Sequence, residues 1–322
     1  MSECRLPLAA MSTDAEIAFE DRLSMQASAV EARLRRLLDD RPLSGEIERP
    51  ERLLAAMRHG VLNGGKRLRP FLVMESAALF APDAKDEMAL NVAAALECVH
   101  CYSLIHDDLP AMDDDDLRRG QPTVHKAYDE ATAILAGDSL LTLAFDILAD
   151  EAPGSRKERS TATIRLALIK GLARAAGLGG MTGGQMLDLA AEHASPDEAG
   201  IIRLQAMKTG ALIRFACEAG AILANASSSD QERLAEFGSA IGLAFQLADD
   251  LLDVTADASQ IGKATGKDAA AGKATLAALH GADWARRQLN GLVEQAHSLL
   301  EPYGEQAAML KAAATFVANR NR

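Results

Sequence analysis

The chain contains 322 residues, of which 48 % are hydrophobic and 25 % are charged, so it is long enough to bury a large core. Its formal net charge of −12 would repel a phosphate backbone, and we therefore expect no nucleic acid partner. No apolar stretch is expected to form the roughly 18–20-residue span that a membrane requires. The N-terminal segment is too polar for a signal peptide, so a cytoplasmic protein is expected.

The composition predicts an all-α fold. Alanine and leucine favour helices and are abundant, whereas aromatic residues make up only 4 % of the chain and β-branched runs are scarce. No Pro/Gly/Ser-rich linker divides the sequence, so we expect a loose N-terminal leader over residues 1–20 and a single-domain helical bundle over residues 21–322. In chain order, helices are expected over residues 18–40, 50–63, 68–80, 86–109, 124–150, 157–176, 197–227, 230–256, 273–300 and 304–320.

Two of these segments, Ala89–Ile105 and Ile241–Val254, are apolar almost all the way round, which predicts helices in the middle of the bundle. Their few polar residues recur at helical spacing and therefore form stripes. The first stripe, continued one turn further, contains Glu97, His100, Ser103 and Asp107, and the second contains Gln246, Asp249, Asp250 and Asp253. We expect both stripes to face one water-filled cavity.

The first candidate site is an acidic run that begins at Asp107 and Asp108 and continues with residues 113–116, placing six carboxylates within ten residues. Unpaired charge at the end of a buried helix is costly, so the carboxylates must be solvated, protonated or neutralised by cations. Hard divalent cations are suited to such oxygen ligands. An ordinary solvated acidic loop is the alternative that the acidic run alone leaves open.

The second candidate site is Asp249-Asp250-Leu-Leu-Asp253, in which Asp249 and Asp253 are one helical turn apart and can reach one ion. An exposed amphipathic helix could carry the same pattern. Mg²⁺ fits these motifs better than Ca²⁺, because it binds through one or two carboxylates together with substrate phosphates. Basic residues that could hold a diphosphate occur separately, at Lys66, Arg69, Arg118, Arg119, Lys208, Lys263, Lys267 and Lys273.

In chain order, the segments NGGKRLRP, LECVHCYSLIHDDLPAMDDDDLRRG, GGQMLDL, KTGALI, FQLADDLLD and GKATGKD resemble the trans-prenyltransferase (polyprenyl diphosphate synthase) family, most closely its bacterial farnesyl diphosphate synthases. The resemblance extends from about residue 20 to the C-terminus. It implies an isoprenoid-synthase-type bundle around a deep central cavity, usually a homodimer, with isopentenyl diphosphate and an allylic diphosphate as substrates and Mg²⁺ as cofactor.

The resemblance also assigns roles to individual residues. It implies metal ligands at Asp107, Asp108, Asp113 and Asp249, with Asp250 and Asp253 in the same second motif. Contacts to the allylic diphosphate are implied for Arg118, Lys208 and Lys263, and contacts to isopentenyl diphosphate for Lys66, Arg69, His100 and Arg119. Thr209 and Gln246 would offer oxygen dipoles to the allylic cation, and Gln185 and Asp188 would support the site.

Product length should depend on the depth of the cavity. Tyr102 lies five residues before Asp107, where a bulky ring would close the cavity floor, with Ser103 beside it. In the family, an aromatic residue there with Pro-Ala inserted in the first acidic motif suggests the fifteen-carbon product; the ring could equally be ordinary core packing. A geranylgeranyl synthase is the nearest rival. A class I terpene cyclase, a non-catalytic subunit of a heteromeric synthase and a Ca²⁺-binding module are further alternatives.

Overall fold

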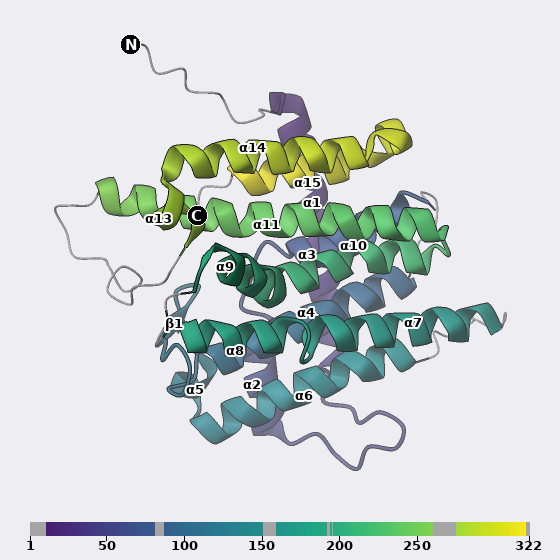
Figure 1. The fold of residues 1–322 in the computed structure, drawn as a ribbon. Coiled ribbons are helices and arrows are strands. Elements are labelled where there is room, and N and C mark those ends of the chain that lie inside the picture. Colours follow the sequence, from purple (N-terminus) through teal and green to yellow (C-terminus); the bar gives the residue numbers. More distant parts are fainter. Residues whose placement is uncertain are drawn as a thin grey trace, which may run out of the picture. The chain divides into compact units, whose positions relative to one another are not determined.

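The computed structural model describes residues 11–80, 87–150, 159–191, 194, 196–259 and 275–319 (Figure 1). Within these ranges the regular secondary structure is helical apart from one hairpin of two short strands, which confirms the all-α fold class. The chain divides into two compact units. The unit that we call the α4 unit comprises Asp21–Lys170 and Ile222–Asn225, and the α11 unit comprises Met1–Glu20, Gly171–Ala221 and Ala226–Arg322.

The α4 unit is built around one apolar helix. Helix α4 (Glu87–Asp107) packs against α2 (Glu51–Val61), α3 (Leu68–Ala78) and α6 (Glu130–Ala149). Consecutive residues 92–99 on α4 are all buried, so the helix has almost no solvent face along this stretch. The remaining elements that lie wholly in this unit are β1 (Leu117–Arg118), β2 (Gln121–Pro122) and α5 (Val124–Ala127), where β1 and β2 pair antiparallel.

The α11 unit is built around the long helix α11 (Ser228–Ser259), which packs against α14 (Ala282–Leu299) and α15 (Ala308–Asn319). Helix α9 (Glu198–Gln205), the π-helix η1 (Ala206–Gly210) and α10 (Ala211–Leu223) follow one another directly. The unit also contains α8 (Met181–Ala191), α13 (Leu276–His280) and the 3₁₀-helix η2 (Glu301–Ala307). Three helices contribute residues to both units, namely α1 (Thr13–Leu37), α7 (Arg159–Ala176) and α10.

The first described helix begins earlier than the sequence suggested. Helix α1 (Thr13–Leu37) includes residues 13–20, so the expectation of a loose leader over residues 1–20 is wrong for that part. Phe19 is fully buried, and its ring centroid lies 5.0 Å from that of Phe316. Asp14 and Glu16 are acidic residues in the first turn, where they complement the positive end of the helix dipole. Burial of the aromatic ring and favourable charge together extend the helix.

No helix is expected between residues 176 and 197, so α8 is missing from the sequence prediction. A Cβ at Gly184 would lie 2.5 Å from the Lys208 Cα, so glycine is required where α8 packs against the backbone of η1. Three expected helices are also interrupted. Residues 124–150 break at Asp129, which caps α6 by accepting from the Thr132 N–H at 2.7 Å, residues 197–227 contain η1, and residues 273–300 break at Gly281.

Two helices, α4 and α6, are long and apolar enough to cross a membrane by length and composition. The expectation that no apolar stretch reaches this length is therefore wrong. Of the most apolar stretch of each helix, 72 % is buried within the protein in α4 and 39 % in α6. One or two such helices are weak evidence for a membrane span, because the core helix of a globular bundle has the same composition.

The burial of Phe19 predicts that Phe19→Ala lowers the free energy of unfolding by about 3–5 kcal/mol, because the substitution leaves a cavity beside Phe316. Ile17→Ala is a matched control, since Ile17 is exposed on the same helix and its truncation should change stability little. Urea denaturation of the two variants measures the difference. Equal stability of both variants would mean that this segment does not pack in solution.

Candidate active site

The acidic run folds back onto the end of α4. The Asp107 carbonyl accepts from the Asp113 N–H at 2.8 Å, and the Asp108 carbonyl accepts from the Asp115 N–H at 3.2 Å. These bonds satisfy carbonyls that the helix end would otherwise leave unpaired, and Pro110 prevents the helix from continuing regularly. The backbones of Asp107 and Asp113 are thereby tied together across the inserted residues, and both side chains are partly exposed.

The third predicted metal ligand of this run, Asp108, is bound by an arginine. Arg118 donates from Nε to both Asp108 carboxylate oxygens, at 2.8 and 3.0 Å, and from its terminal nitrogen to Oδ1 at 2.5 Å. Burial raises the pKa of the Asp108 carboxyl, and the charge and hydrogen bonds of Arg118 offset that shift only in part. Asp108, predicted as a metal ligand, and Arg118, predicted as a diphosphate contact, thus form one ion pair, in which Arg118 compensates the charge of Asp108.

A second ion pair is buried inside the α4 unit. Arg67 pairs with Glu97, and only 2 and 3 % of the two side chains are exposed. Arg67 also donates to the Val61 carbonyl at 2.6 Å, which closes the loop that precedes α3. The expectation that Glu97 faces a water-filled cavity is therefore wrong. Helical spacing alone could not separate a solvated carboxylate from one neutralised by a basic residue that lies 30 positions earlier.

The loop Asn63–Lys66 docks onto the β1–β2 hairpin, so the two basic segments NGGKRLRP and LRRG meet. Asn63 donates from its amide to the Arg118 carbonyl at 3.2 Å, and Arg119 donates to the Gly64 carbonyl. Gly65 has a φ of +116°, and a Cβ there would lie 2.6 Å from Nη1 of Arg119. Glycine at this position therefore serves both the backbone conformation and the close approach of the guanidinium.

Arg69 and His100 are neighbours, as the resemblance implied for two ligands of one diphosphate. Arg69 Nη1 lies 3.3 Å from His100 Nε2, and Arg69 Nε is buried with no hydrogen-bond partner among the described residues. Burial lowers the pKa of His100 well below its ordinary value, and the charges of Arg69 and Arg119 lower it further. The cluster is thus electropositive with a neutral imidazole, an environment that suits a polyanion.

Tyr102 and Ser103, the predicted chain-length residues, follow on α4. The Tyr102 side chain is almost fully buried, and Ser103 donates from its hydroxyl to the His100 carbonyl at 2.8 Å. The Tyr102 ring meets the His106 imidazole edge-on, with centroids 5.7 Å apart. His106 Nε2 lies 3.1 Å from the Ile134 carbonyl, so this histidine connects the end of α4 with α6.

In the α11 unit, the segments around Lys208 and Gln185 lie together. The Lys208 ammonium forms a 2.5 Å ion pair with Asp188 on α8, and both Lys208 and Thr209 lie within η1. The amide oxygen and nitrogen of Gln185 are buried with no hydrogen-bond partner among the described residues. A π-helix widens one turn of the backbone and often occurs at functional sites. The sequence motif identified these residues but could not reveal the π-helical turn.

The second acidic motif is split by its helical register. Asp249 and Gln246 are partly exposed on α11, whereas Asp250 is buried and accepts from the Gln205 amide at 3.1 Å. Asp250 therefore has a structural partner within its own unit. The side chain of Asp253 and the predicted diphosphate ligand Lys263, with Lys267 and Lys273, lie outside the described residues.

Among the side chains that the structure describes, no group of three His, Cys, Asp or Glu residues could hold a metal ion by itself. The donors at the end of α4 nevertheless fit Mg²⁺, because Asp107 and Asp113 are partly exposed carboxylates held close by the backbone. Mg²⁺ is usually bound through one or two carboxylates plus substrate phosphates, so a complete protein cage is not required.

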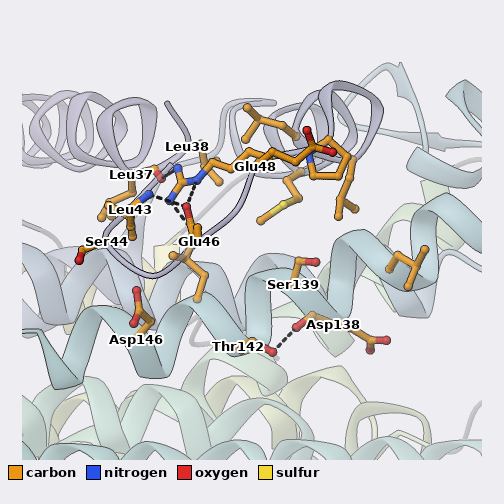
Figure 2. Close-up of a pocket in the computed structure, with 17 residues that line it drawn as sticks. Leu37, Leu38, Leu43, Ser44, Glu46, Glu48, Asp138, Ser139, Thr142 and Asp146 are labelled. Carbon is orange, nitrogen blue, oxygen red and sulfur yellow. Dashed lines mark hydrogen bonds and ion pairs between the residues drawn. The ribbon is translucent and has the colours of Figure 1, made fainter. Parts of the chain in front are cut away.

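One cavity lies elsewhere in the α4 unit. It measures about 530 Å³ and is lined by the end of α1, the following loop, α2 and α6 (Figure 2). Arg49 stabilises the loop by donating to the Leu37 and Asp39 carbonyls at 2.9 and 2.8 Å and by pairing with Glu46. None of the predicted site residues lines this cavity, so it is not the substrate cavity that the sequence predicted.

Comparison with known proteins identifies the family of the chain. Residues 50–314 match the polyprenyl synthetase family. The farnesyl diphosphate synthase of Escherichia coli is 45 % identical over 84 % of this chain and 90 % of its own length. Geranylgeranyl pyrophosphate synthase 11 of Arabidopsis thaliana is 38 % identical over 98 % of this chain and 87 % of its own length. The crystal structure of an FPP/GFPP synthase from Zymomonas mobilis is 42 % identical, with a TM-score of 0.81, and covers 94 % of this chain and 99 % of its own.

The all-α fold and these similarities define a trans-prenyltransferase. The chain belongs to the polyprenyl synthetase family. Its relatives include both farnesyl and geranylgeranyl synthases at comparable identity, so the family fixes the reaction class and leaves the product length open.

The environment of His100 generates a prediction for its titration. In the free protein the pKa of His100 should lie below 6.5, and inorganic diphosphate should raise it, because the anion offsets the charges of Arg69 and Arg119. NMR titration of the imidazole measures both values. Arg69→Gln should raise the pKa without added diphosphate, since it removes one of the nearby charges. A pKa of His100 that is not lowered and does not change with diphosphate would contradict the electropositive character of this cluster.

Proposed function

We propose that this protein condenses isopentenyl diphosphate with dimethylallyl diphosphate and then with geranyl diphosphate, giving farnesyl diphosphate. The observation that carries the proposal is the arrangement along α4. A basic cluster at Arg69, His100 and Arg119 supports one diphosphate, and the acidic run that begins at Asp107 supports a second one through Mg²⁺. A reaction between two diphosphate substrates needs these two different modes of anion binding.

Each of the two modes of anion binding would hold one of the two substrates. Lys66, Arg69, His100 and Arg119 would bind isopentenyl diphosphate, whose diphosphate is retained during the reaction. Asp107 and Asp113, with Asp249, would hold the allylic diphosphate through Mg²⁺. Bound there, Mg²⁺ withdraws charge from the diphosphate and so eases cleavage of the allylic C–O bond. Arg118, which is paired with Asp108, would donate to the same phosphates.

Residues of the α11 unit would complete the allylic site. Lys208 is held by Asp188 and would contact the departing diphosphate, as would Lys263. Thr209 and Gln246 would turn oxygen dipoles toward the allylic cation, and apolar walls would protect this cation from water until the double bond of isopentenyl diphosphate attacks. Asp250 and Asp253 belong to the same motif; we propose that Asp250 supports it through Gln205.

A single-substrate terpene cyclase would not need the Arg69–His100 cluster, and a non-catalytic subunit would not need intact acidic motifs.

We also propose a homodimer. Helix α6 leaves Ile134 and Leu135 exposed by 45 and 55 %, and a second copy could cover this apolar face. Light scattering that gives the 34.1 kDa mass of a single chain would contradict the dimer.

Incubation of the purified protein with isopentenyl diphosphate, dimethylallyl diphosphate and Mg²⁺ tests the function. We expect a fifteen-carbon diphosphate as the main product and loss of activity with EDTA, because the acidic run needs the cation to hold the allylic diphosphate. Chromatography of the dephosphorylated products identifies the chain length. A twenty-carbon product would replace the farnesyl assignment, and no condensation with either allylic substrate would reject the synthase.

The chain-length proposal rests on the bulky, buried ring of Tyr102 as the cavity floor. Tyr102→Ala should therefore extend the main product from fifteen to twenty carbons or more, since the smaller side chain deepens the cavity. Tyr102→Phe is the matched control and should keep the original length, because it preserves the ring. If the product spectrum of the alanine variant equals that of the parent, Tyr102 is not the floor.

A further inference from the structure

His106 lies directly before the acidic run and is assigned no role in binding or chemistry above. Its ring contacts two other parts of the α4 unit, namely the Tyr102 ring on its own helix and the backbone of α6. We propose that His106 is a positioning residue for product length, which holds the Tyr102 ring in the orientation that closes the cavity floor. This inference rests on the proposed function of Tyr102.

The contact between the two rings follows from helical spacing. Tyr102 and His106 are four residues apart on α4, so their side chains lie on the same face in successive turns. The ring planes are inclined at 80° with centroids 5.7 Å apart, an edge-to-face arrangement that favours one relative orientation of two aromatic rings. An imidazole fixed in place therefore restricts rotation of the tyrosine ring.

Helix α6 fixes the imidazole. His106 Nε2 lies 3.1 Å from the Ile134 carbonyl, and because a carbonyl oxygen only accepts, Nε2 must carry the proton. Gly137, one turn further along α6, leaves the space that the ring occupies. A Cβ at Gly137 would overlap Nε2 and would lie 2.5 Å from Cδ2 and 2.8 Å from Cε1. The imidazole is thus held by a hydrogen bond and by close packing against a glycine.

The sequence of contacts runs from Gly137 and the Ile134 carbonyl to His106 and then to Tyr102. Removing the imidazole keeps the phenol ring but removes the edge-on contact that restricts its orientation. The ring can then turn aside and admit a longer chain. Product length is consequently set by a pair of rings and the helix behind them, and not by the volume of one side chain alone.

The proposal is tested by product ratios of His106→Ala, His106→Gln and Gly137→Ala. His106→Ala should raise the ratio of twenty-carbon to fifteen-carbon product by about threefold, the factor that loss of one edge-to-face contact would give. His106→Gln keeps an amide donor for the Ile134 carbonyl but loses the ring edge, so it should show a similar increase, which separates the ring contact from the hydrogen bond. Gly137→Ala should reproduce the effect of His106→Ala by displacing the imidazole.

Gly60→Ala serves as the control for general crowding of α4. A Cβ at Gly60 would lie 2.5 Å from Cδ1 of Ile105, so the variant strains the same helix without touching either ring. The melting temperature of every variant is measured beside its product ratio. A purely structural role would lower the melting temperature and leave the ratio unchanged, as expected for Gly60→Ala.

The double variant with Tyr102→Ala and His106→Ala separates this inference from the proposed function. If His106 acts through Tyr102, the double variant should give the product ratio of Tyr102→Ala alone. A full additional shift in the double variant would overturn the positioning role, as would an unchanged ratio in His106→Ala when Tyr102→Ala lengthens the product. An unchanged product in Tyr102→Ala would instead reject the cavity floor, and this inference with it.

Discussion

The cost of placing charge on a buried helix governs the α4 unit. Helix α4 has almost no solvent face along residues 92–99, yet Glu97 lies within that stretch. The two buried carboxylates, Glu97 on α4 and Asp108 directly after it, are compensated by Arg67 and Arg118. These pairs fix the two basic segments NGGKRLRP and LRRG against the helix. The geometry of the candidate site is therefore a consequence of neutralising charge in the core.

The same constraint explains how one helix can serve two anionic substrates. Arg67 is paired with the buried Glu97. Arg69, in contrast, has a buried Nε without a partner among the described residues and lies beside a neutral His100. At the other end, Asp107 and Asp113 are drawn together by the backbone and stay partly exposed. Positive charge and carboxylate oxygens are thus separated along α4, which suits direct binding of one diphosphate and metal-mediated binding of another.

The sequence predicted the helical class, most helices and the motifs, because helix-forming composition and charge spacing are local properties. It failed where a distant partner decides the outcome. Glu97 is expected on a stripe that faces a water-filled cavity, because its partner Arg67 lies on another segment. Helix α8 is not expected from the sequence, because the need for Gly184 arises from its packing against the backbone of η1. The buried Phe19 similarly extends α1 into the expected leader through a ring contact with Phe316. Arg67 and His106 lie within quoted motifs, but the sequence assigns them no role, because their contacts with Glu97 and the Ile134 carbonyl depend on the fold.

The central claim of the proposed function is that the acidic run at the end of α4 holds the allylic diphosphate through Mg²⁺, while the basic cluster on α4 binds the other diphosphate. A crystal structure with Mg²⁺, isopentenyl diphosphate and a non-hydrolysable allylic thiolodiphosphate tests this directly. We predict that Asp107 and Asp113 hold the allylic diphosphate through Mg²⁺ and that the second diphosphate lies on Arg69, His100 and Arg119. Both diphosphates bound away from these residues, or an allylic diphosphate held without metal, would contradict it.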